Sequence, residues 1–189
     1  MFPQAQLNQA ADYLLQLTNN ARANPARTAA QFGIDLNEGL EPGTISAAPK
    51  PPLASNSALL NSINGHLQFW LKQFQDPDSR NPHTELGDGT QQTRASAAGY
   101  ANPSGVGENV DWEYTSLPVD LLTTVAQQFQ ELFVDKTEPG RGHRLNILRP
   151  DYKDIGCGVA AGVVPASSPK GAGDNLLLLG QDFGIPANG

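Results

Sequence analysis

The chain has 189 residues, of which 19 are glycine, 15 are proline and 16% are charged, and this composition fits one domain, 1–189, with a real core and long turns. The formal net charge is −7 and no basic cluster exceeds three residues, which argues against nucleic acid as a partner because such binding rests on neutralised phosphates. No apolar run is long enough to cross a bilayer, so we expect no transmembrane segment.

The first residues, MFPQAQLNQAADY, lack the charged and apolar regions of a signal peptide. The sequence itself therefore leaves two options, a cytosolic protein or one whose targeting segment has been removed. The single cysteine, Cys157, excludes an internal disulfide and does not indicate a compartment. We interpret Cys157 as a small core thiol, because it follows the alternation of a predicted strand.

The N-terminal third predicts two helices and a long loop. Apolar residues recur at helical spacing over 6–21, in a stretch rich in Ala, Leu and Gln. Asn24 and Pro25 then resemble an N-cap and a first helical residue, which predicts a short helix over 26–32. Residues 35–53 are rich in glycine, proline and small polar residues, and we expect a loop there.

The clearest periodicity of the chain predicts a long amphipathic helix over 56–74, ending at Asp76 and Pro77. Its buried face would consist of Leu59, Leu60, Ile63, His66, Leu67, Trp70, Leu71 and Phe74. Because His66 lies within this apolar face, we expect a buried or half-buried histidine with one hydrogen bond.

The middle of the chain predicts two more helices around an extended segment. A short helix is expected over 91–98, an extended glycine-loosened stretch over 105–110, and a second long amphipathic helix over 116–135 with Pro118 in its first turn. These helices need a sheet to pack against.

We expect that sheet to come from two strands, 154–164 and 175–185, joined by a hairpin loop over 165–174. The preceding stretch, 140–148, is expected to form a turn. Helices and strands are segregated along the chain, which predicts an α+β fold with an antiparallel sheet.

Two histidines lie among predicted turn residues, and both are candidates for a site. His83 follows the long helix, and His143 lies between the second long helix and the first of the two strands. Glu108 lies in a third loop-like segment. None of the three is evidence of a site when taken alone.

Five elements in order nevertheless resemble one known family. The most specific is GHRLNIL at 142–148, followed by Tyr152 and by IGCGVA at 155–160. The others are LQLTNNARANP at 15–25, His83 with Asp88, Gly89 and Arg94, GEN at 107–109, and QDFG at 181–184. Together they resemble the CAP superfamily of cysteine-rich secretory, antigen 5 and pathogenesis-related-1 proteins, and most closely its disulfide-free bacterial SCP-like branch.

The resemblance implies a three-layer α-β-α sandwich with a small antiparallel sheet between helices, and a secreted or periplasmic protein whose signal peptide has been removed. It also implies a cleft with two histidines and two acids. Carried over by motif, these are His83, His143 and Glu108, with Asp135 as the fourth residue. Glu131 and Glu138 compete for that fourth position.

Two imidazoles with one or two carboxylates can act in two ways. They can hold a divalent metal through His83, His143 and Glu108, with zinc as the default ion and open coordination positions, or they can form a polar network in which a carboxylate fixes the imidazole tautomer. No HExxH motif is present, so nothing points to a dedicated metallohydrolase.

Three functions follow from the resemblance. The first is a non-catalytic extracellular binding module for a small ligand, a lipid, a cell-envelope component or a divalent cation. The second is a metal-dependent hydrolase of a peptide or cell-envelope polymer. The third is a structural or interaction domain whose cleft histidines only hold loops together.

Overall fold

The computed structural model describes residues 2–73, 81–84, 86–101, 104–168 and 171–187. The helices are α1 (Gln4–Ala23), α2 (Pro25–Gln31), α3 (Ser57–Gln73), α4 (Gln91–Ala97), α5 (Leu121–Val134) and α6 (Gly142–Leu148). The strands are β1 (Ala54–Ser55), β2 (Gly105–Thr115), β3 (Asp154–Val163) and β4 (Asn175–Ile185). The predicted end of the long helix at Asp76 and Pro77 lies outside the described residues.

The sheet has the strand order β1-β3-β4-β2. The three long strands pair antiparallel, whereas the two residues of β1 pair parallel with the start of β3. The predicted hairpin of β3 and β4 is confirmed, but the sheet is larger than expected. The extended stretch predicted over 105–110 is part of an eleven-residue strand, β2, which pairs with β4 along its whole length.

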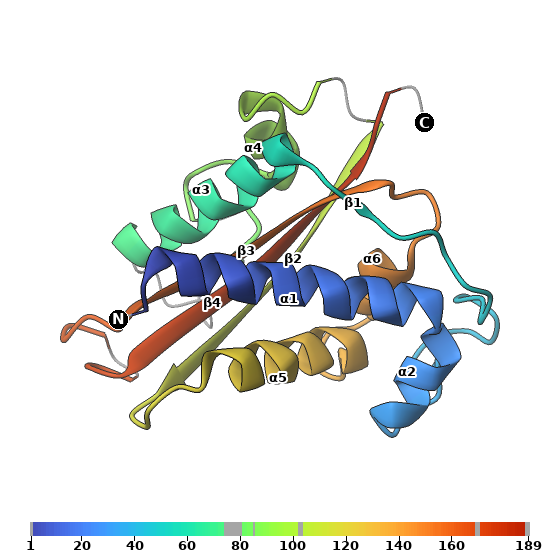
Figure 1. Ribbon diagram of the computed structural model, residues 1–189, viewed down its shortest axis with the longest axis horizontal. Coiled ribbons are helices and arrows are strands. Elements are labelled where there is room, and N and C mark those ends of the chain that lie inside the picture. Colours follow the sequence, from blue (N-terminus) through green and yellow to red (C-terminus); the bar gives the residue numbers. More distant parts are fainter. Residues whose placement is uncertain (1, 74–80, 85, 102–103, 169–170, 188–189) are drawn as a thin grey trace.

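Helices cover both faces of this sheet. Figure 1 shows α1 and α5 on one side of the strands, and α3 with α4 on the other. The side chains of β4 divide accordingly. Leu177, Leu179 and Phe183 pack into the core that contains α1 and α5, whereas Leu176 and Leu178 pack into the core that contains α3. The predicted three-layer α-β-α arrangement is therefore confirmed.

The small residues of β3 let α3 approach the sheet closely. A Cβ atom on Gly156 would lie 2.2 Å from the backbone carbonyl carbon of Leu59, a distance that real Cβ atoms do not reach. Glycine is therefore required at this position by close contact with a helix backbone. His66 on the same helix is 1% exposed, and its Nδ1 lies 2.7 Å from Asp88 Oδ2, as predicted for a buried histidine with one bond.

The second long helix starts later than predicted. Asp120 accepts a hydrogen bond from the backbone N–H of Thr123, so it caps α5, and Leu121 is the first helical residue. The expected start at residue 116 was therefore wrong, and Pro118 precedes the helix instead of lying in its first turn.

The stretch expected to form a turn contains the seven-residue helix α6. Arg144 fixes this helix to the end of α5, because its fully buried guanidinium donates to the carbonyl oxygens of Phe133 and Leu36. These bonds fix the first turn of α6 against the end of α5.

Within the described ranges, none of the helices combines the length and the apolar character that crossing a membrane requires.

Candidate functional site

A pocket of about 430 Å³ lies between β2, the start of α6 and the loop before residue 84. We call it the histidine pocket, because two of the three histidines line it. Its lining residues are Asn81, Pro82, His83, Glu108, Val110, Trp112, Glu138, Gly142, His143 and Asn146. Three separate segments of the chain therefore meet at one cavity.

The first histidine is held by a buried carboxylate on β2. His83 Nδ1 lies 2.8 Å from Glu108 Oε1, and the backbone N–H of His83 donates to Asn81 Oδ1. The side chain of His83 is 28% exposed, whereas that of Glu108 is 1% exposed. Glu108 therefore orients the ring from behind while the ring itself reaches the pocket.

The second histidine is held in the same way from the end of α5. Asp135 Oδ1 lies 2.8 Å from His143 Nδ1, and Asp135 Oδ2 accepts the backbone N–H of the same residue at 2.8 Å. Asp135 has a left-handed backbone, with φ at 53°, where α5 ends. This conformation turns its carboxylate toward the first turn of α6.

The two imidazoles face a common space. Their ring centroids lie 6.0 Å apart, and the His143 side chain is 21% exposed. Both Nδ1 atoms are occupied by carboxylates, while neither Nε2 atom hydrogen-bonds to a residue that the structure describes. The Nε2 atoms are therefore the ring atoms through which this pocket can bind a ligand, exchange a proton or hold a metal.

A buried ionic network lies behind His83. Arg94 donates one hydrogen bond to Glu108 Oε2 and lies 3.4 Å from Asp88 Oδ1, whose other oxygen contacts His66. Both oxygens of Glu108 are thus engaged, one by His83 and one by Arg94. Burial raises the pKa of Glu108, but the His83 hydrogen bond and the charges of His66, Arg94 and His83 outweigh it, so the pKa lies below its usual value.

A second carboxylate on the neighbouring strand behaves in the opposite way. Asp182 lies directly opposite Glu108 in the β2–β4 register and is fully buried. Burial, followed by the negative charge of Glu108, raises the pKa of Asp182 well above its usual value. The surroundings of the pair therefore favour the negative charge on Glu108 over a charge on Asp182.

Two asparagines fix the distance between β2 and α6. Asn109 Nδ2 donates to the carbonyl oxygen of His143, and Asn146 Nδ2 donates to the carbonyl oxygen of Glu108. The two amides also bond to each other at 3.0 Å. These bonds join the strand that carries Glu108 to the helix that carries His143.

All four predicted cleft residues come together here, although Asp135 lies behind His143 and does not line the cavity. Of its two competitors, Glu138 lines the pocket, whereas Glu131 lies on α5, is not among the lining residues and lines a separate pocket with Glu113. Among the described residues, no group of three or more His, Cys, Asp and Glu side chains is placed to hold a metal ion. The zinc set of His83, His143 and Glu108 stays a prediction.

Sequence reasoning gave no role to two residues of this network. Arg94 lies in a short polar helix, where an arginine does not stand out, and Asp182 lies in an apolar strand. A charged residue inside an otherwise buried strand was the available signal for Asp182, because such a group needs a partner.

Comparison with known proteins finds a matching sequence family and a solved structure with a similar fold. The chain matches the model of the family described as CAP, the cysteine-rich secretory protein family, over residues 15–162. It is also similar to a solved structure of an extracellular protein containing an SCP domain from Bacillus anthracis str. Ames, with a TM-score of 0.55 and 15% sequence identity.

That structural match covers 98% of this chain and 44% of the other, so the chain spans less than half the length of that protein. At 15% identity the likeness shows the fold alone. No curated protein matches the chain.

Proposed function

Because the chain belongs to the CAP, or cysteine-rich secretory protein, family, we propose that it is a secreted or periplasmic binding module. In this proposal the histidine pocket binds a small polar ligand or a divalent cation and does not catalyse a reaction. The observation that carries this proposal is the pairing of both imidazoles. His83 and His143 are each held at Nδ1 by a buried carboxylate, and each leaves Nε2 for a ligand. The extracellular solved structure with the same fold supports secretion.

The donor set fits a cation with two protein ligands. A carboxylate on the far nitrogen is the usual partner of a metal-binding histidine, because it fixes the tautomer and makes the other nitrogen a better ligand. His83 and His143 would hold the ion, and the ion would supply positive charge to a bound oxygen. Glu108 and Asp135 act as orienting carboxylates in this arrangement, because their oxygens already contact the two rings.

The lining also supports binding over catalysis. No serine, threonine, cysteine or lysine is among the described residues that line the pocket, so these residues offer no hydroxyl, thiol or amine nucleophile. Both oxygens of Glu108 are engaged and its pKa is lowered, which makes it a poor general base.

The metal version can be tested by thermal unfolding with zinc, nickel or cobalt. A cation at a hundredfold excess over its Kd stabilises by about 2.7 kcal/mol, which raises the Tm of a chain of this size by roughly 5 to 10 °C. We expect this shift to disappear in His143→Gln and to persist in Glu41→Gln, which removes an exposed carboxylate elsewhere. No shift with any of the three metals would sink the metal version.

The hydrolase is the second candidate, because a histidine held by a carboxylate at Nδ1 is also the arrangement of a general base. It predicts cleavage of a peptide or cell-envelope polymer that is lost in His83→Gln and His143→Gln together. Cleavage that survives both changes would rule out this mechanism. Coupling between His83 and Glu108 in a double-mutant cycle, with no ligand detected, would instead favour a structural domain.

A further inference from the structure

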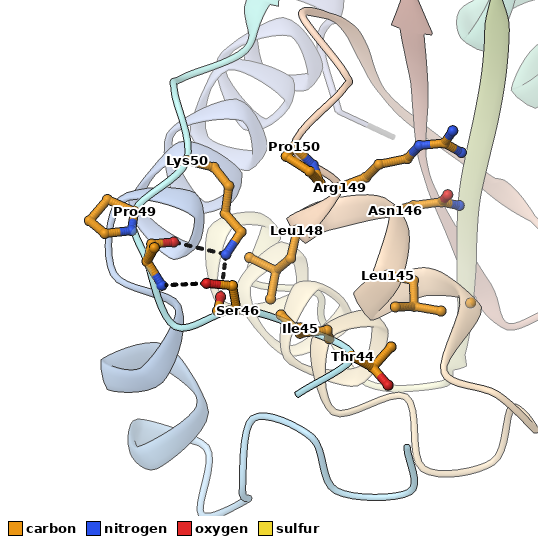
Figure 2. Close-up of a pocket in the computed structure, with 12 residues that line it drawn as sticks. Thr44, Ile45, Ser46, Pro49, Lys50, Leu145, Asn146, Leu148, Arg149 and Pro150 are labelled. Atoms are coloured by element: carbon orange, nitrogen blue, oxygen red, sulfur yellow. Dashed lines mark hydrogen bonds between the residues drawn. The ribbon is translucent and has the colours of Figure 1, made fainter. Parts of the chain in front are cut away.

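A second and larger cavity, of about 640 Å³, lies against a neighbouring face of α6. We call it the Lys50 pocket. Figure 2 shows its walls, which come from α6, from the residues just after it and from the segment 44–50 that precedes β1. The predicted loop over 35–53 thus forms one wall of a cavity, a role that its composition did not indicate.

Most of this wall is apolar. Ile45, Leu145, Leu148 and Pro150 line the cavity, and Ile45 and Leu148 are 5% and 2% exposed. Cavities of this size with apolar walls and a few polar groups are typical of small-molecule sites, in which the polar groups fix the orientation of the ligand.

The polar group that distinguishes this cavity is the ammonium of a buried lysine. Lys50 is 8% exposed and lines the pocket. Its Nζ donates to the carbonyl oxygens of Ser46 and Ala48, the latter at 2.8 Å, and Figure 2 shows both bonds. An ammonium has three N–H donors, so these two carbonyls leave one donor and the full positive charge.

No carboxylate among the described residues lies within ion-pair distance of this charge. A second cation, Arg149, lines the cavity, but its side chain is 48% exposed and lies 3.6 Å from Asp151. Arg22 is a third cation nearby: its backbone carbonyl accepts the N–H of Lys50, and its fully buried guanidinium also donates only to carbonyls in the described part of the chain. Burial and the charge of Arg22 both lower the pKa of Lys50. The cavity thus has a local excess of buried positive charge in a chain whose net charge is −7.

A purely structural role for Lys50 is to hold the 44–50 segment together through its two carbonyl partners. That role explains the bonds, but it does not require the ammonium to line a cavity. Arg22 holds neighbouring backbone in a similar way and does not line the pocket.

We propose that the Lys50 pocket binds a small organic monocarboxylate, with its carboxylate on Lys50 Nζ and its apolar body against Ile45, Leu145 and Leu148. A carboxylate supplies the missing counter-charge and accepts the remaining N–H, and a charge-assisted bond of this kind is stronger than a neutral one. The apolar body removes the walls of the cavity from water. This site does not depend on metal or ligand in the histidine pocket.

The test compares two probes with the same body, 3-phenylpropionate and the neutral 3-phenylpropanol, titrated separately into the whole chain and followed by ¹⁵N–¹H NMR. We expect the carboxylate to bind about tenfold or more tightly than the alcohol, from the gain of one charge-assisted bond. The shifted amides should be those of segment 44–50 and α6.

Lys50→Met and Lys50→Gln are the matched variants. Both remove the charge, and glutamine keeps a donor for the Ser46 and Ala48 carbonyls, so at least one should keep the cavity intact. We expect the two probes to bind with equal affinity to either variant, while Lys72→Met, which removes an exposed lysine on α3, keeps the wild-type preference.

Three results would overturn the proposal. The first is equal or absent binding of the two probes to the wild-type chain. The second is a preference for the carboxylate that survives in both Lys50 variants. The third is a set of shifted amides confined to the histidine pocket or to the groove between α1 and α3.

Discussion

The histidine pocket and the Lys50 pocket share Gly142 and Asn146 of α6, yet they treat buried charge in opposite ways. In the histidine pocket, Arg94 meets Glu108, and each imidazole meets its own carboxylate. In the Lys50 pocket, the ammonium meets only backbone carbonyl oxygens among the described residues.

The difference indicates what each pocket can gain from a ligand. The charges of the histidine pocket are compensated within the protein, so its geometry is fixed without a ligand and only the Nε2 atoms remain for binding. The charge of the Lys50 pocket is not compensated, so an anion entering it gains an attraction that the folded chain leaves unused. The histidine pocket is a preorganised polar site, whereas the Lys50 pocket has a positive charge without a carboxylate partner among the described residues.

Glu108→Gln should break the pairing of the histidine pocket and give the largest loss of stability. Among the described residues, Arg94 would keep Asp88, at 3.4 Å, as its one ion-pair partner, so we expect the free energy of unfolding to fall by about 3 kcal/mol. Urea denaturation at pH 7 measures this loss.

Lys50→Met is the matched change in the other pocket. It removes a cation whose described partners are neutral carbonyls, and it should lower the free energy of unfolding by only about 1 kcal/mol. Equal losses in the two variants would show that Lys50 stabilises the fold as much as Glu108 does. This result would contradict the proposed difference between the two pockets.

The sequence predicted the parts of the fold that rest on apolar periodicity. The helices α1 and α3 and the strands β3 and β4 carry long regular patterns, and they form where these patterns indicate. The length of β2 was missed because its pattern includes Glu108 and Asp111, which a strand buries only when it has partners for them. A single chain does not reveal those partners, since they come from distant segments.

The same limit applies to α6 and to the two pockets. A helix of seven residues is too short for a clear apolar period, and GHRLNIL has a fully buried arginine in its middle. The four cleft residues came from family resemblance, not from spacing. Lys50 was not predicted because it lies in an irregular segment, where burial depends on tertiary contacts alone.

Asp111, a carboxyl on β2 next to the histidine pocket, can be tested through the pH dependence of stability. It lies on β2 between two lining residues, and burial, followed by the charge of Glu131, raises its pKa to about 7. A raised carboxyl pKa stabilises the folded state fully below the unfolded pKa, near 4, and this stability is lost as the pH rises through about 7.

From this group the free energy of unfolding should therefore fall by roughly 2 to 3 kcal/mol between pH 5 and pH 8. Asp111→Asn should remove this part of the slope, so the difference between wild type and variant isolates it from the contribution of Asp182. Asp151→Asn, which changes a carboxylate whose side chain is 64% exposed, should keep the wild-type slope. Parallel slopes for wild type and Asp111→Asn would contradict the assignment.

Asp135→Asn has a small expected effect on stability and tests the pairing at α6 itself. Asparagine tolerates the left-handed backbone of this position and keeps an oxygen for the His143 N–H, so the unfolding free energy should fall by only about 1 kcal/mol. Without the carboxylate, the neutral His143 ring should lose its preference for the tautomer protonated at Nδ1. Long-range ¹⁵N–¹H NMR of the imidazoles reports this change, and His83, which keeps Glu108, is the control in the same sample. If His143 keeps its tautomer in Asp135→Asn, the carboxylate does not set the ring, and the Nε2 atom would be presented to the pocket by the backbone of α6 alone.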